Sequence, residues 1–172
     1  MGIFSRKFQI LADSLTAYRF FTSLVISYFH NIPVLYTSIL VVTGWASDLF
    51  DGLLARKSGD TLLGDLDVYV DIIFSFSILY YLCANEFLNP ILSVLISMAF
   101  IIAHILLKND APLMLWMALS YFSFIIYTFI QDKTSFLVVI VWVVLTPILT
   151  PTRSLTQIYH FFDEISVLKK HS

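Results

Sequence analysis

Seven residues between positions 48 and 71 have types and spacing suited to chemistry: Asp48, Asp51, Gly52, Arg56, Gly64, Asp67 and Asp71. Asp48 and Asp51 are three residues apart, so a helix places them on one face. Asp67 and Asp71 are four residues apart and share a face in the same way. The short connection between the two pairs makes their helices antiparallel neighbours, with both pairs at the same end. We therefore expect the four carboxylates to converge.

Converging carboxylates repel one another and are suited to a divalent cation with oxygen ligands, for which Mg²⁺ is the usual choice beside phosphate. Two such ions could clamp a phosphoryl group. Gly52 and Ala55 keep the carboxylate face of the helix clear for a ligand, Arg56 supplies a cation for phosphate oxygens, and Gly64 lies where the loop could close over the ligand. This pattern predicts a site for metal and a nucleotide diphosphate, whereas Asp60 and Asp65 are interpreted as solvated helix ends.

The composition indicates that this site lies in a membrane protein. Of the 172 residues, 59% are hydrophobic and 13% are charged, and the mean hydropathy is +0.86. A soluble domain of this size could not bury so much apolar surface while presenting so few charges to water. No basic patch is present, so the sequence gives no indication of nucleic-acid binding.

Apolar runs near the spanning length predict an all-α integral membrane protein with six transmembrane helices in one domain over residues 1–172. Residues 1–15 are predicted to form a short amphipathic interfacial helix, residues 16–150 the six-helix bundle, and residues 151–172 a cytoplasmic tail. The expected spans are Thr16–Phe29, Pro33–Arg56, Leu62–Ala84, Ile91–Leu107, Leu113–Ile130 and Ser135–Thr150.

The basic residues predict the orientation of these spans. With six spans, nine of the ten basic residues fall on one side and only Lys133 on the other. The positive-inside rule makes the first side cytoplasmic, so both termini and the aspartate cluster are expected to face the cytoplasm. Arg19, near the start of the first span, is expected to extend toward the lipid headgroups.

The pattern resembles the signature of the CDP-alcohol phosphatidyltransferase family: Asp-x-x-Asp-Gly-x-x-Ala-Arg, eight residues, Gly, three residues, Asp, three residues, Asp. The six spans and the Leu15-Thr16-x-x-Arg19 opening of the first span also fit this family. The resemblance implies transfer of a phosphatidyl group from CDP-diacylglycerol or a related CDP-lipid to an alcohol, with release of CMP, by a homodimer. By position, it implies Mg²⁺ or Mn²⁺, two ions in all, on Asp48, Asp51, Asp67 and Asp71. Asp71 would also be the general base, and Gly52, Ala55, Arg56 and Gly64 would form the CDP site.

The sequence departs from this signature in one place. Seven residues rather than eight separate Arg56 from Gly64, and two rather than three separate Gly64 from Asp67. Asp65 is therefore a second candidate for the role of Asp67, although only Asp67 keeps the four-residue spacing to Asp71. The connection is shorter than in the signature, and both helical pairs are intact.

The acceptor alcohol is not specified by the signature. Ser47-Asp48 and the Leu-Leu-Ala-Arg ending are most similar to the phosphatidylglycerophosphate and cardiolipin synthase branches, which implies glycerol 3-phosphate or another alcohol as acceptor and a bacterial cell membrane. The Lys108-Asn109-Asp110 loop differs from the Arg-Glu pair expected in the glycerophosphate branch. Lys108 and Arg153 are candidates for binding a phosphate on the acceptor, or are only determinants of topology.

Two other functions are compatible with the same residues. Carboxylates inside a membrane also mark ion paths, so a divalent-cation transporter is one alternative. It would need acidic residues across the whole membrane depth, whereas here they lie at one end of the second and third spans. The other alternative is a non-catalytic relative of the family that serves as a structural partner.

Overall fold

The computed structural model describes residues 3–58, 63, 66–152, 155–156, 159 and 161–163. Within helices, the side chains of residues 3–6 and 55–58 are outside this description. The described residues form an all-α structure whose main helices are α1 (Ile3–Tyr28), α2 (Val34–Ser58), α3 (Asp67–Ala84), α4 (Pro90–Leu107), α5 (Ala111–Gln131) and α6 (Lys133–Leu149). The predicted all-α class is therefore confirmed. The prediction of six transmembrane helices is not supported to the same extent, because length and composition indicate three candidate spans among the described residues.

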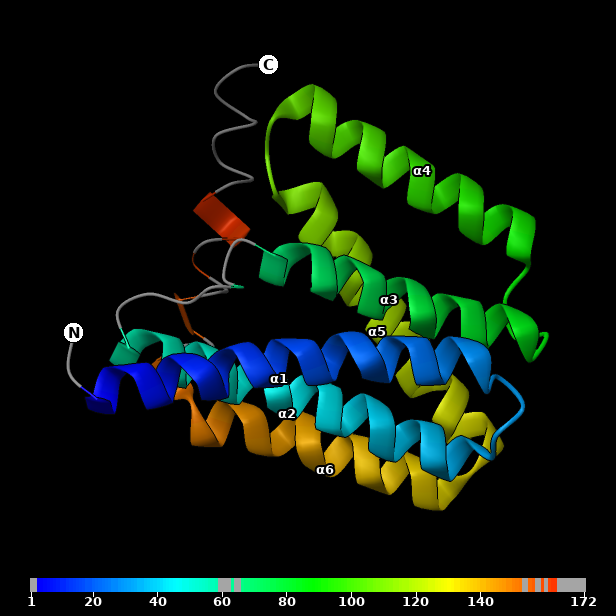
Figure 1. Cartoon of the computed structure of the whole chain (residues 1–172). Coiled ribbons are helices and arrows are strands. Elements are labelled where there is room, and N and C mark those ends of the chain that lie inside the picture. The colour runs from blue at the N-terminus through cyan, green and yellow to red at the C-terminus, as the bar shows by residue number, and fades with distance from the viewer. Residues whose placement is uncertain are drawn as a thin grey trace.

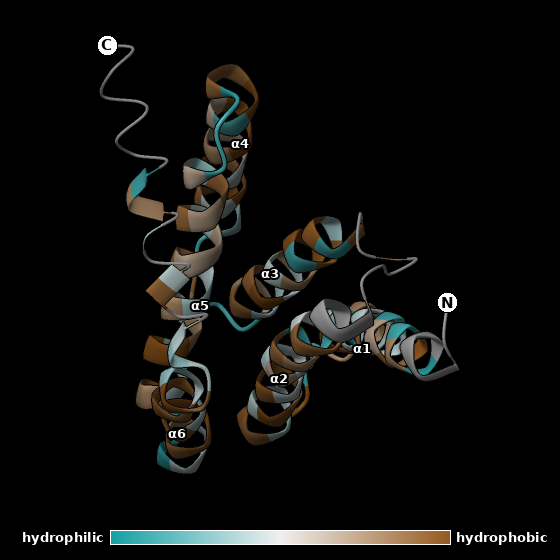
Figure 2. Cartoon of the chain, turned by 90° about the vertical axis from the view of Figure 1, so that its left-hand side faces the viewer, coloured by the Kyte–Doolittle hydropathy of each residue, from teal (hydrophilic) through white to brown (hydrophobic). Residues whose placement is uncertain are grey.

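The helices form two groups of three. Viewed from the end in Figure 2, α4, α5 and α6 lie in one row, and α1, α2 and α3 lie beside it. Helix α1 packs against α2 and α3, while α2 contacts α6 and α3 contacts α5 to join the two groups. The end of α2 and the start of α3 lie at the same end of the molecule as the N-terminus, and the α1–α2, α3–α4 and α5–α6 turns lie at the other (Figure 1).

The first helix differs from the prediction of a separate interfacial helix over residues 1–15. Helix α1 is a single helix of 26 residues from Ile3 to Tyr28, without a break near Leu15 or Thr16. The physical reason is visible in its sequence, which contains neither glycine nor proline in this range. A change in polarity along the chain does not interrupt the backbone hydrogen bonds of a helix, so the amphipathic start and the apolar continuation form one element.

Three of the described helices, α3, α4 and α5, are long and apolar enough to cross a membrane. Helix α6 is also apolar but has 17 residues. Helix α4 is the most apolar and the least covered by protein, with Ser97 its only residue classed as buried. Its exposed side chains are hydrophobic, among them Ile91, Leu95, Met98, Ile102 and Leu106, and hydrophobic residues run along its length in Figure 2. Such a surface is compatible with lipid and indicates a membrane protein.

The core lies between the two groups of helices. Phe74, Ile78, Tyr81 and Leu82 of α3 are buried there against residues of the other packed helices: Ile26, Val41, Phe124, Tyr127 and Val139. Close to this core, Gly44 of α2 lies against the ring of Phe74, and a Cβ atom at position 44 would come within 2.4 Å of that ring. The absence of a side chain at Gly44 therefore leaves room for the Phe74 ring of α3 against α2, one turn before Asp48.

Candidate metal and phosphate site

The four predicted carboxylates are brought together as the helical spacing predicts. Asp48 and Asp51 lie in α2, and Asp67 and Asp71 lie in the first two turns of α3. Asp48, Asp67 and Asp71 each offer a carboxylate oxygen within 4.8 Å of the other two, close enough to hold one metal ion. All these ligands are hard oxygen donors, so the set fits Mg²⁺ or Mn²⁺, although it does not identify the ion.

Asp51 lies deeper than the other three carboxylates and does not belong to this group of three. Its side chain is 6% exposed, against 34% for Asp48, 35% for Asp67 and 29% for Asp71. The Thr16 hydroxyl of α1 donates to Asp51 Oδ2 at 3.3 Å. Asp51 thus connects α2 to α1 at the base of the carboxylate cluster.

Arg19 of α1 lies at the centre of the four carboxylates. Its guanidinium donates from Nη1 to Asp48 at 3.0 Å and to Asp71, and from Nη2 to Asp51 at 2.5 Å and to Asp67 at 2.6 Å. Its side chain is 1% exposed. The prediction that Arg19 extends to the lipid headgroups is therefore wrong, because the carboxylates of α2 and α3 provide ionic partners inside the bundle.

The sequence contains a pattern that could have predicted the position of Arg19 beside the aspartates. Thr16 and Arg19 are three residues apart and share a face of α1, and a cation buried in a membrane helix needs an acidic partner. The aspartate cluster was the main acidic group in the adjacent helices. What the sequence does not contain is the rotation of α1 that turns this face toward α2 and α3.

The predicted CDP-binding residues are only partly described. Gly52 lies in α2 and is half-buried, and Ala55 and Arg56 lie in the last turns of α2, where their side chains are outside the described residues. Gly64 also lies outside the described residues, as do Asp60, Asp65 and Arg153. Leu63 lies in the connection between α2 and α3 that is shorter than in the family signature. Its backbone N–H donates to Asp13 Oδ1 of α1 at 3.0 Å. Helix α1 therefore holds this connection as well as the carboxylates.

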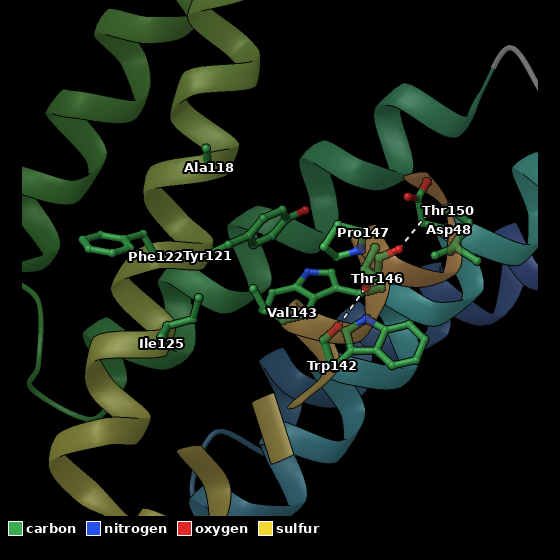
Figure 3. A pocket seen from close by; sticks show the side chains of 12 residues that line it. Asp48, Ala118, Tyr121, Phe122, Ile125, Trp142, Val143, Thr146, Pro147 and Thr150 are labelled. Atoms are coloured by element: carbon green, nitrogen blue, oxygen red, sulfur yellow. Dashed lines mark hydrogen bonds between the residues drawn. The ribbon is translucent and has the colours of Figure 1, made fainter. Parts of the chain in front are cut away.

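Two cavities adjoin the carboxylates and share Trp45, Asp48, Ala118 and Tyr121 in their walls. The smaller, of about 290 Å³, contains Arg19, Asp48 and Asp71 in its lining. The larger, of about 520 Å³, lies between α2, α5 and α6 and is mostly apolar. In Figure 3, side chains of α5 and α6 line this larger cavity, with Asp48 and Thr150 at the same end. The two cavities thus adjoin one another at these shared residues, and Asp48 lies in the wall of both.

The cation predicted for an acceptor phosphate, Lys108, is exposed at the end of α4, where its backbone is left-handed with φ of 49°. It does not line either of these cavities. Comparisons of the chain with models of protein families, with curated proteins and with solved structures found no match. The function must therefore be argued from the residues and their geometry.

Proposed function

We propose that this protein is a membrane CDP-alcohol phosphatidyltransferase that transfers a phosphatidyl group from CDP-diacylglycerol, or a related CDP-lipid, to an alcohol. The observation that carries the proposal is the convergence of Asp48, Asp51, Asp67 and Asp71 beside a cavity that shares wall residues with a larger, mostly apolar one. The spacing within each aspartate pair is that of the family signature, while the connection between the pairs is two residues shorter. A CDP-lipid needs both parts of such a site, since it joins a charged diphosphate to acyl chains.

Each part of the site has a proposed role in this reaction. Asp71 lines the smaller cavity and takes the proton of the acceptor hydroxyl. The acceptor oxygen then forms a bond to the phosphatidyl phosphorus, and the bond from that phosphorus to the CMP oxygen breaks. Asp48, Asp51, Asp67 and Asp71 would hold the metal, with Mg²⁺ the first choice and two ions in all. When bound, metal offsets negative charge on the phosphate oxygens.

The apolar cavity is proposed to receive an acyl chain. Its walls carry Leu49, Phe122 and Ile125, and its polar end carries Asp48. Pro147 lies inside α6 and in the wall of the same cavity. An acyl chain in this cavity would cover the apolar walls in place of water or a membrane lipid. The phosphates attached to that chain would then reach the carboxylates.

The proposed arrangement in the membrane has six spans and both termini in the cytoplasm, as the basic residues predict. In this arrangement α1 and α2, which carry Arg19, Asp48 and Asp51 of the site, cross the membrane together with the more apolar helices. The carboxylates then lie near the cytoplasmic surface, where nucleotide-activated lipids are made. A homodimer and a bacterial cell membrane complete the proposal.

The decisive experiment measures CMP. Purified protein in lipid nanodiscs is given CDP-diacylglycerol, Mg²⁺ and one of glycerol 3-phosphate, inositol, inositol phosphate, serine or phosphatidylglycerol, and CMP is quantified by chromatography. We expect release with one acceptor, dependent on divalent metal, and at least about 100-fold slower in Asp71→Asn and Asp51→Asn because general acid–base catalysis and metal ligation each contribute factors of this size.

The matched control is Asp110→Asn, which removes an exposed carboxylate at the α4–α5 turn and should leave the rate unchanged. Full activity of Asp71→Asn would contradict its role as base. A folded protein that binds CDP but releases CMP with no alcohol would favour the non-catalytic relative, and flux of divalent metal into liposomes without a CDP-lipid would favour the transporter.

A further inference from the structure

The guanidinium of Arg19 uses its donors in an uncommon way. Each of its two Nη atoms donates to two carboxylates, so the four Nη hydrogens serve four different aspartates: Asp48, Asp51, Asp67 and Asp71. A guanidinium has five N–H donors in all. The fifth, Nε–H, is buried and has no hydrogen-bond partner in the part of the chain that the structure describes.

The position of Arg19 coincides with that of the candidate metal ligands. Asp48, Asp67 and Asp71, whose oxygens lie within 4.8 Å of one another, are all bonded to the same guanidinium. A divalent cation on these three ligands would therefore lie next to a fixed positive charge and would need the same carboxylates. Two cations this close repel one another, and the repulsion is large at a site shielded from water.

The guanidinium also has a structural effect that does not depend on metal. Asp51 and Arg19 are almost fully buried, and four carboxylates held this close repel one another unless a cation lies among them. Arg19 remains charged at all ordinary pH values and comes from a third helix, α1, so one ion pair network ties α1 to both α2 and α3.

From these contacts we infer that Arg19 is a built-in counter-cation: it holds the four carboxylates in place without metal and competes with metal for them. This inference rests on the metal-binding part of the proposed function. It assigns to Arg19 a positioning role and a role in setting metal affinity, and it predicts that the protein stays folded when metal is removed. Metal occupancy would then respond to the metal concentration around the protein, rather than being permanent.

The test uses Arg19→Met, which keeps much of the aliphatic volume but removes the charge, and Arg19→Lys, which keeps one charge but cannot bridge four carboxylates. Mn²⁺ binding is measured by electron paramagnetic resonance on purified protein, and the unfolding temperature is measured in EDTA and in Mn²⁺. Lys7→Met is the matched control, because Lys7 is an exposed cation of the same helix.

We expect Arg19→Met to bind Mn²⁺ at least about tenfold more tightly than the original protein, and to lose thermal stability in EDTA much more than in Mn²⁺. Arg19→Lys should lie between the two, and Lys7→Met should match the original. Should Arg19→Met fail to fold in EDTA, it is purified in Mn²⁺ and the affinity comparison is made on Arg19→Lys. Unchanged or weaker Mn²⁺ binding in a folded Arg19 variant would overturn the inference.

Parallel measurement of CMP release separates this inference from the proposed function. Metal-dependent CMP release together with unchanged Mn²⁺ affinity in the Arg19 variants would overturn the counter-cation role alone. Tighter Mn²⁺ binding in Arg19→Met without CMP release by the original protein would support the counter-cation role and contradict the proposed reaction. Failure of every protein to bind Mn²⁺ would overturn the inference.

Discussion

Asp51 differs from the other three aspartates at the residue scale. It is nearly buried and accepts hydrogen bonds from both Arg19 and Thr16, whereas Asp48, Asp67 and Asp71 are each about one third exposed. A buried carboxylate keeps its position only if its oxygens are hydrogen-bonded. We interpret Asp51 as the carboxylate that fixes the register of α2 against α1, in addition to its predicted role as a metal ligand.

The Thr16 hydroxyl provides the test of this interpretation. In Thr16→Val the hydrogen bond to Asp51 is lost while the shape of the side chain is kept, and the lost bond is worth about 1 kcal/mol. If the lost hydrogen bond is needed to hold Asp51 in its active position, CMP release should be about fivefold slower in Thr16→Val. Thr16→Ser keeps the hydroxyl and should be close to the original protein. Equal rates for the valine and serine variants would mean that this contact does not position Asp51.

At the scale of elements, the packing of the Phe74 ring of α3 against α2 depends on Gly44. A methyl group there would meet the buried ring of Phe74, which would have to shift. We expect Gly44→Ala to destabilise the protein by about 1–3 kcal/mol and to slow CMP release, because Asp48 lies one turn further along α2. Thermal unfolding in detergent measures the first effect. Adding Phe74→Leu should restore part of the loss, and a double variant no more stable than Gly44→Ala alone would contradict this explanation.

The start of α6 depends on a different local feature. Asp132 precedes the helix and accepts hydrogen bonds from the backbone N–H groups of Thr134 at 3.2 Å and Ser135 at 2.9 Å. Hydrogen bonds from the hydroxyl and the backbone of Ser135 lower the pKa of Asp132 below its ordinary value. Because the pKa is lower in the folded state, this cap stabilises the protein above the unfolded pKa of about 3.9, and its contribution is lost as the pH falls through the lowered value.

We therefore expect the unfolding temperature to fall more between pH 7 and pH 3 in the original protein than in Asp132→Asn. Asparagine still caps the helix but does not titrate over this range. All other acidic groups are common to both proteins, so the difference between the two pH profiles reports Asp132. Identical profiles would show that protonation of this cap does not affect stability.

At the scale of the whole molecule, the proposed six spans place the α5–α6 turn and the first turns of α1 on opposite sides of the membrane. Single cysteines introduced as Lys133→Cys and Lys7→Cys, with Cys83→Ser in both, test this arrangement. A maleimide that cannot cross membranes should label position 133 in intact cells, and position 7 only after the cells are opened. Labelling of both positions from the same side would contradict the five spans, an odd number, that the proposal places between them.

The sequence by itself determined the all-α class, the approximate positions of α2 to α6 and the pairing of the aspartates, because helical periodicity depends only on the distance between residues along the chain. It placed the helix ends within a few residues, apart from α1, where the absence of glycine and proline outweighed the change in polarity. The convergence of the two pairs followed from the short connection between α2 and α3. These inferences need no knowledge of how distant segments pack.

Only the tertiary structure decided which helix faces which. It turned Arg19 toward the carboxylates instead of the headgroups, and it buried Asp51 more deeply than the three other carboxylates. It also brought Gly44 against Phe74 and left an apolar cavity between α2, α5 and α6. Each of these features depends on the rotation of one helix relative to another. That rotation follows from the packing of side chains from several helices at once, and no local spacing in the chain encodes it.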